Sequence, residues 1–145
     1  MDFHPFLVHF PISLFFIAFL FEILRHKLDW IHENIPLLVF ILATIFAIPS
    51  SITGDSAKLL ITDISEFLTL LDNHETMGSL VTLSALIFSF FFVYMKLKFP
   101  MKRISNLKFA VFLLITLMVF YTGFLGGKLV QDFGVGVKNN LEKKD

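Results

Sequence analysis

Residues 6–24 read FLVHFPISLFFIAFLFEIL, a run in which Glu22 is the only acidic or basic residue apart from His9. About 20 apolar residues are enough for a helix to cross the roughly 30 Å hydrocarbon core of a bilayer. Lipid cannot hydrogen-bond to a bare backbone, so such a segment must be helical. No basic residue precedes the run and no small-residue cleavage site follows it. We therefore expect a retained transmembrane helix and not a cleaved signal peptide.

Three further apolar runs of similar length follow, at about 35–52, 77–97 and 107–125. Hydrophobic residues make up 56% of the chain and charged ones 17%, with twenty phenylalanines, which is more apolar bulk than a water-soluble protein of this size can hide. Short connections favour antiparallel neighbours. The sequence predicts an all-α membrane protein, one antiparallel four-helix transmembrane bundle over residues 1–145, with a flexible tail at about 138–145.

The connection between the second and third spans carries apolar residues at helical spacing: Leu60, Ile64, Phe67 and Leu71. Asp63 and Glu66 lie off that stripe. This pattern predicts a short amphipathic helix on the bundle surface or in the lipid interface, ending at Asp72-Asn73. A re-entrant loop is the alternative.

Basic residues predict the orientation, because cytoplasmic connections are enriched in lysine and arginine. Seven lie in the first and third connections: Arg25, Lys27, Lys96, Lys98, Lys102, Arg103 and Lys108. The other side has only Lys58 before the tail, which adds four lysines. We place both termini outside. Glu22, near the cytoplasmic end, is expected to reach the headgroups.

Net charge and cysteine content exclude several classes of function. The formal net charge is +0, and no basic patch, nucleotide loop or serine triad is present, so nucleic acid is not an expected partner. The absence of cysteine excludes disulfides, thiol chemistry and thiolate metal sites. The expected partner is the lipid bilayer, and a homo-oligomer stays among the alternatives.

The five histidines divide by side. His26 and His32 lie among charged residues of the first connection and are expected to be solvated. His4, His9 and His74 lie at the outer ends of the first and third spans, where polar groups need a partner. His4 and His9 are five residues apart, or about 140° around a helix, so they do not share one face. Pro11, inside the first span, leaves the Leu7 carbonyl without its helical partner.

Small residues collect in the same outer half of the bundle: Ala43, Thr44, Ala47, Ser50, Ser51, Gly54, Gly78, Ala85, Gly123, Gly126 and Gly127. They either let helices approach closely or leave a cavity. Packing is the commoner explanation, and histidines that face the same region favour the cavity.

The opening His4-Pro5-Phe6-Leu7-Val8-His9-Phe10-Pro11-Ile12 resembles the signature of a bacterial membrane family catalogued as domain of unknown function 2231. Later pieces fit the same order: Thr53-Gly54-Asp55, His74-Glu75, Gly126-Gly127-Lys128-Leu129-Val130 and Gly134-Val135-Gly136-Val137. Gln131 departs from the aromatic residue that many relatives carry there. The resemblance implies a four-helix protein of the bacterial cytoplasmic membrane. Family members look similar to small membrane cytochromes that hold haem b, which is an analogy of fold.

The first hypothesis for function is a redox module with a b-type haem in the outer half of the bundle. His9 and His74 are the predicted ligands, with His4 as the substitute for His9, since neutral imidazole suits haem iron. Gly78, Gly126 and Gly127 would give the porphyrin room. Electrons would pass between quinol in the membrane and a periplasmic or other extracytoplasmic redox protein.

A transition-metal site is the second hypothesis, with His4, His9, Asp55, His74 and Glu75 as ligands that suit zinc, iron or copper. The third is structural: the histidines cap helices and bond to carboxylates or backbone carbonyls, in an assembly or anchoring subunit. Transport has the least support, because no chain of ionisable groups crosses the predicted spans.

Overall fold

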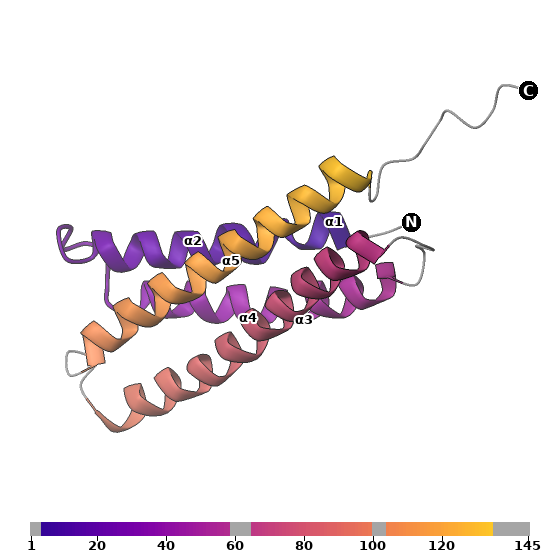
Figure 1. The fold of residues 1–145 in the computed structure, drawn as a ribbon. Helices are drawn as coiled ribbons and strands as arrows, with labels where there is room; N and C mark the ends of the chain where they lie inside the picture. Colours follow the sequence, from indigo (N-terminus) through magenta and orange to yellow (C-terminus); the bar gives the residue numbers. More distant parts are fainter. Residues whose placement is uncertain (1–3, 59–64, 100–103, 135–145) are drawn as a thin grey trace, which may run out of the picture.

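The computed structural model describes residues 4–58, 65–99 and 104–134, and every secondary-structure element in these ranges is helical (Figure 1). The elements are α1 (His4–Leu7), α2 (His9–Leu24), α3 (Ile35–Lys58), α4 (Ser65–Lys98) and α5 (Ser105–Phe133). The predicted all-α fold is confirmed. The predicted flexible tail at 138–145 lies outside the described residues.

α1 and α2 together form the first span, with Val8 between them. Pro11 has no N–H to donate to the Leu7 carbonyl, so one bond of the helical ladder is missing. Val8 still bonds on both sides, to the His4 carbonyl at 3.1 Å and from the Ile12 N–H at 3.4 Å, and keeps helical angles, with φ −63° and ψ −25°. Pro49 has a smaller effect, because α3 continues through it.

The four long helices form a closed antiparallel ring (Figure 1). Each packs against its neighbour in sequence, and α5 also packs against α2. α1 lies at the same end as the start of α4 and the end of α5 (Figure 1). This end, which contains His4 and His74, is called the pocket end below. The opposite end contains the α2–α3 and α4–α5 connections.

The last two long helices extend further than the sequence predicted. α4 has 34 residues and α5 has 29. At about 1.5 Å per residue they measure about 51 Å and 44 Å, more than the bilayer core requires. Phe67 and Leu71, predicted in a separate amphipathic helix, belong instead to the first turns of α4. Asp72 and Asn73 do not end a helix there, because neither removes a backbone bond as proline does. Leu60 and Ile64 lie outside the described residues.

Phenylalanines from all four long helices fill the centre of the bundle. Phe15, Phe40, Phe92 and Phe112 are each at most 1% exposed. The rings of Phe40 and Phe112 stack with centroids 4.4 Å apart and planes 8° from parallel. Phe15 and Phe92 meet this pair edge to face. The sequence predicted this division, with bulky residues in the inner half and small ones towards the pocket end.

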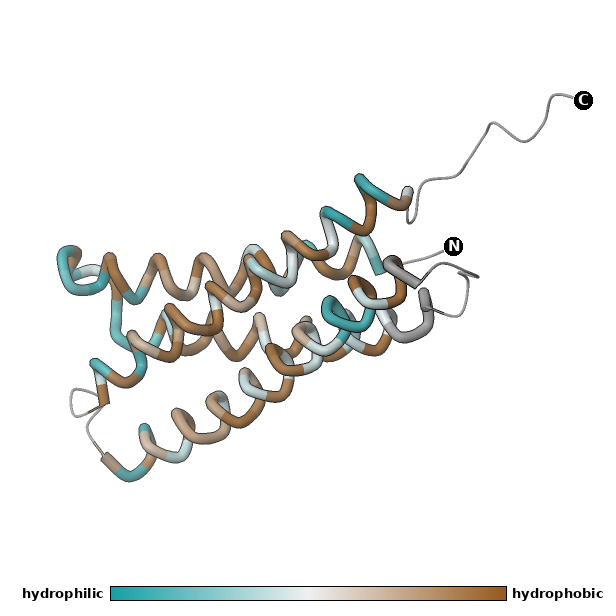
Figure 2. Tube along the Cα trace, viewed as in Figure 1, coloured by the Kyte–Doolittle hydropathy of each residue, from teal (hydrophilic) through white to brown (hydrophobic). Residues whose placement is uncertain are grey.

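The outside of the bundle is also apolar, as a lipid-facing surface must be. Figure 2 shows hydrophobic residues along the helices and hydrophilic ones concentrated near their ends. Within the described residues, four helices are long and apolar enough to cross a membrane: His4–Leu24, Ile35–Gly54, Phe67–Lys98 and Ser105–Phe133. The chain is a multi-pass membrane protein associated with the lipid bilayer.

A buried ionic network joins the helices towards the opposite end. Glu22 is 0% exposed, so the expectation that it reaches the headgroups is wrong. Its Oε1 accepts a hydrogen bond from Arg25 at 2.6 Å, and its Oε2 lies 3.1 Å from Lys108 Nζ. Arg25 also donates to Ser105 Oγ at 2.6 Å, and Lys108 to the Glu33 carbonyl at 3.3 Å. One carboxylate thus binds two cations where they shield it from lipid.

Candidate functional site

A cavity of about 140 Å³ lies between the helices at the pocket end. Its lining comes from all four spans: His4, Val8, Pro11, Ile12, Ala47, Ser50, Ser51, Gly54, Leu71, His74, Glu75, Gly78, Ser79, Val81, Thr82, Val119, Thr122 and Gly123. By volume it could hold on the order of ten water molecules. Small side chains produce this space, because alanine, serine and glycine stand where phenylalanine fills the centre of the bundle.

His4 reaches the cavity from α1 and is anchored on α3. Its Nδ1 lies 3.0 Å from the Ser50 carbonyl oxygen and 3.1 Å from Thr53 Oγ1. The Thr53 hydroxyl donates to the Pro49 carbonyl at 2.9 Å, so its oxygen can accept from the imidazole. The His4 ring also lies against Gly54: a Cβ added there would be 3.1 Å from His4 Cε1.

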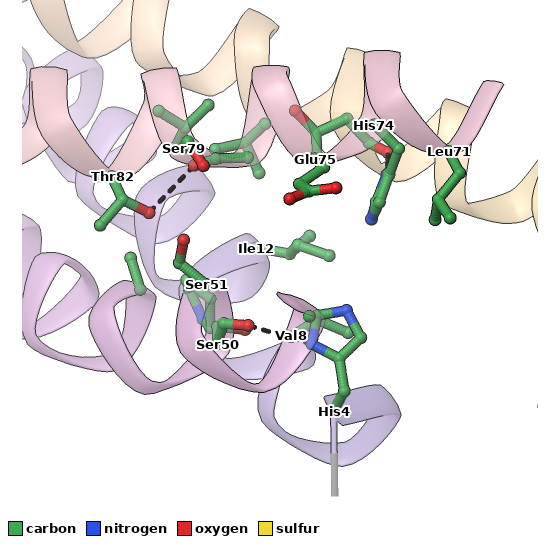
Figure 3. A pocket seen from close by; sticks show the side chains of 18 residues that line it. His4, Val8, Ile12, Ser50, Ser51, Leu71, His74, Glu75, Ser79 and Thr82 are labelled. Atoms are coloured by element: carbon green, nitrogen blue, oxygen red, sulfur yellow. Dashed lines mark hydrogen bonds between the residues drawn. The ribbon is translucent and has the colours of Figure 1, made fainter. Parts of the chain in front are cut away.

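His74 reaches the cavity from α4 and is anchored on α5 in the same way. Its Nδ1 lies 3.0 Å from the Thr122 carbonyl oxygen. A Cβ added at Gly126 would be 3.0 Å from His74 Cε1. Figure 3 shows the His4 and His74 rings entering the pocket from opposite sides. Both side chains line the same cavity.

These contacts determine the tautomer of both imidazoles. A carbonyl oxygen only accepts hydrogen bonds, so Nδ1 must carry the proton at His4 and at His74. In the neutral ring the lone pair is then on Nε2. Histidines that ligate metals usually have this arrangement, with one ring nitrogen donating to a carbonyl or carboxylate and the other facing the metal.

His9 lies outside this pocket. It lines a separate hollow on the bundle surface with Phe6, Phe10, Ser13 and Leu14. Its Nδ1 is 2.5 Å from the Pro5 carbonyl oxygen, and the side chain is exposed. The structure therefore brings together His4 and His74 and not the predicted first pair, His9 and His74. The angle of about 140° between His4 and His9 explains why one helix cannot direct both inward.

A family model described as "Predicted membrane protein (DUF2231)" matches residues 1–139. The chain belongs to this family. Comparison with curated proteins and with solved structures finds no match. In this DUF2231 protein three segments that carried the resemblance meet at the pocket: His4 in the opening segment, Gly54, and His74 with Glu75. The glycine segment that includes Gly126 supports the His74 ring.

The other predicted ligands of the DUF2231 protein are placed differently. Glu75 lines the pocket beside His74, and its carboxylate points into the space between α3 and α4 (Figure 3). Asp55 lies in the last turns of α3, and its side chain is outside the described part of the structure. Among the described side chains, no group of three or more histidine, aspartate or glutamate residues could hold a metal ion.

The three glycines predicted to make room have three different surroundings. Gly78 lines the pocket, where a Cβ would be 3.9 Å from a methyl of Thr122. Gly126 supports the His74 ring and does not line the cavity. A Cβ at Gly127 would meet nothing within 4 Å. Sequence reasoning did not single out Ser50 and Thr122 as anchors, because each anchors a histidine through its backbone carbonyl, which every residue has.

Proposed function

We propose that this membrane protein binds a b-type haem at the pocket end, where His4 and His74 would hold its iron. The observation that carries the proposal is the matched pair of imidazoles. Each comes from a different span, each has its proton placed on Nδ1 by a backbone carbonyl, and both rings enter the pocket from opposite sides. Neutral imidazole with an Nε2 lone pair is the form that binds haem iron.

The number of donors favours haem over a bare metal ion. A zinc site takes three or four protein ligands. The described side chains contain no such group, as stated above. In a haem the porphyrin supplies the equatorial nitrogens, so two histidines complete the coordination. The residues that line the cavity near them include Val8, Ile12 and Leu71, which suit an apolar macrocycle.

The cavity has to widen before it admits a porphyrin, since its volume is only about 140 Å³. Widening is feasible at this end because the pocket reaches the surface at Ser79 and Gly123, both exposed. The small residues between α3 and α4 interlock less than the phenylalanines at the centre. Haem uptake would therefore separate helix ends without opening the phenylalanine layer.

A bound haem would supply one-electron transfer between quinol in the bilayer and a redox protein in water. The chain's own residues would exclude water and hold the two imidazoles. In this proposal the pocket end lies on the extracytoplasmic face of a bacterial cytoplasmic membrane, an orientation that the distribution of basic residues supports. Arg25 and Lys108 contribute less to that argument than the sequence suggested, because both pair with buried Glu22.

The test is the optical spectrum of protein purified in mild detergent from haem-replete cells. We expect a Soret band and, after reduction, b-type bands. His4→Ala and His74→Ala should each abolish the low-spin spectrum. His9→Ala is the matched control: it removes an exposed imidazole five residues from His4 and should retain the spectrum. Loss of the bands in His9→Ala but not in His4→Ala would refute the assignment.

A structural role is the alternative that the same preparation tests. Both imidazoles bond to backbone carbonyls of another helix, and the same bonds would hold the helices together in an assembly or anchoring subunit. A colourless, metal-free preparation from haem-replete cells would favour that role. Metal analysis of the sample would separate it from a site for a transition-metal ion.

A further inference from the structure

The pocket contains one arrangement of residues built twice. In each copy a histidine at the pocket end of one span bonds to a backbone carbonyl of the next span. His4 bonds to Ser50 on α3, and His74 bonds to Thr122 on α5, both at 3.0 Å. In each copy a glycine lies four residues after that carbonyl and against the ring. We call each set of histidine, carbonyl and glycine a half-site.

The half-sites repeat in sequence as well as in space. His4 and His74 each follow an aspartate by two residues, in Asp2-Phe3-His4 and Asp72-Asn73-His74. The anchoring helices carry Ser50-x-x-x-Gly54 and Thr122-x-x-x-Gly126. α1 and α4 begin at the pocket end, and α3 and α5 finish there (Figure 1). The first helix pair therefore runs in the same directions as the second.

Helix geometry explains why the glycine lies at that spacing. Residues four apart lie on one helix face, one turn above each other. The helical ladder uses one lone pair of the carbonyl, so the second can accept a proton from the imidazole. A ring that bonds to this carbonyl must then lie over the residue four further on. A Cβ would lie 3.1 Å from the His4 ring at Gly54 and 3.0 Å from the His74 ring at Gly126, so each ring would have to give way by a few tenths of an ångström.

We infer that Gly54 and Gly126 are positioning residues that let the imidazoles of His4 and His74 reach the Ser50 and Thr122 carbonyls. Each glycine thereby fixes the Nδ1–H tautomer of its histidine and the direction of Nε2. Only the identity of what the pair holds rests on the proposed haem function. The positioning itself is a property of the protein without any ligand.

The experiment uses ¹⁵N-histidine labelling of the haem-free full chain in nanodiscs, at a pH where imidazole is neutral. Ring nitrogen shifts distinguish the two tautomers, and histidine substitutions assign the signals. Wild type should show His4 and His74 as Nδ1–H. His32 gives the opposite reference, because its Nδ1 accepts from the Asn34 N–H at 3.3 Å. Gly126→Ala should shift His74 towards mixed tautomers and leave His4 unchanged, and Gly54→Ala should do the reverse.

The chain supplies a matched control on the same helix as Gly126. A Cβ at Gly127 meets nothing within 4 Å, and Gly127 does not line the pocket, so Gly127→Ala should leave both tautomers unchanged. All three substitutions replace glycine by alanine within a helix, which favours folding. An unchanged His74 tautomer in Gly126→Ala, or an equal change in Gly127→Ala, would overturn the inference.

A second arm measures haem affinity. If haem binds, Gly126→Ala should weaken it by roughly 10- to 100-fold, the usual effect of disturbing groups that orient a metal ligand. The low-spin electron paramagnetic resonance signal should shift as well. If the tautomers respond as expected but no haem binds to wild type, the positioning stands and the haem proposal fails. If haem binds through both histidines but the glycine substitutions leave the tautomers unchanged, the haem proposal stands and the positioning inference fails.

Discussion

Glu22→Gln converts a fully buried carboxylate into a neutral amide and leaves two cations without their counter-ion. Lys108 is 1% exposed, and its remaining acceptor is the Glu33 carbonyl at 3.3 Å. Arg25, at 13% exposed, keeps its hydrogen bond to Ser105. Removing one partner of a buried ion pair typically costs roughly 3–5 kcal/mol, because the other charge stays buried. The Lys108 ammonium is almost fully enclosed, so we expect the loss of stability in Glu22→Gln to lie near the upper end of that range.

Lys108→Met should destabilise the protein less than Glu22→Gln does. Methionine keeps most of the buried lysine's bulk, and Glu22 retains its 2.6 Å contact with Arg25. We expect about 3 kcal/mol, the lower end of the range. The double variant removes the lysine charge together with the carboxylate. The cost of the double variant should therefore fall short of the sum of the two single costs by about 0.5–3 kcal/mol, the size of coupling expected between contacting residues.

The assay is equilibrium unfolding by SDS in mixed micelles, followed by the fluorescence of Trp30. Trp30 is the only tryptophan and lies in the connection next to this network. Lys27→Met, which removes an exposed lysine from the same connection, is the control and should change stability by less than about 0.5 kcal/mol. Strictly additive single effects, each below about 1 kcal/mol, are what an exposed pair would give. That outcome would refute the argument that this charge pair is buried.

Two further predictions concern packing and orientation. Phe112→Ala should destabilise the bundle by roughly 3–5 kcal/mol, because the ring is 1% exposed and stacked on Phe40, whereas Phe90→Ala, at 74% exposed, should have little effect under the same unfolding assay. The chain has no cysteine, so Lys27→Cys and Asp132→Cys report on opposite ends without background labelling. A membrane-impermeant maleimide added to intact cells should label Asp132→Cys and not Lys27→Cys, and the opposite result would reverse the proposed orientation.

The four spans could be predicted because a helix that crosses lipid must be apolar along its length, and this is visible in the sequence. Each needs about 20 apolar residues, and the four runs supply them. The ends of α4 and α5 could not be predicted in this way. Their outer turns contain Asp72, Asn73 and Gln131, which hydropathy excludes from a span although nothing there breaks a helix. How far a helix extends beyond the bilayer depends on helix propensity and packing, and these are harder to predict from the sequence than hydropathy is.

The candidate site was only partly predictable for a related reason. Spacing showed that His4 and His9 point in different directions but not which of them faces inward. The outer half of the first span is apolar on most sides, so no polar face distinguishes the side towards the bundle from the side towards lipid. The pairing of Glu22 with Lys108 could not be predicted for the same reason. The sequence assigned Lys108 to the cytoplasmic connection, whereas α5 directs its side chain into the bundle. Rotation about the helix axis depends on tertiary packing.

The two ends of the bundle differ in how much they resist separation of the helices, and this difference bears on how a ligand could enter. Towards the opposite end, one carboxylate binds groups from α2 and α5, and four phenylalanines interlock beside it. At the pocket end, two imidazoles that pack on glycines link helices, one between α1 and α3 and one between α4 and α5. Both links lie within a repeated helix pair and not between the pairs. The pairs can therefore move apart at this end while each histidine keeps its anchor. A ligand that enters between the pairs would meet both imidazoles already oriented.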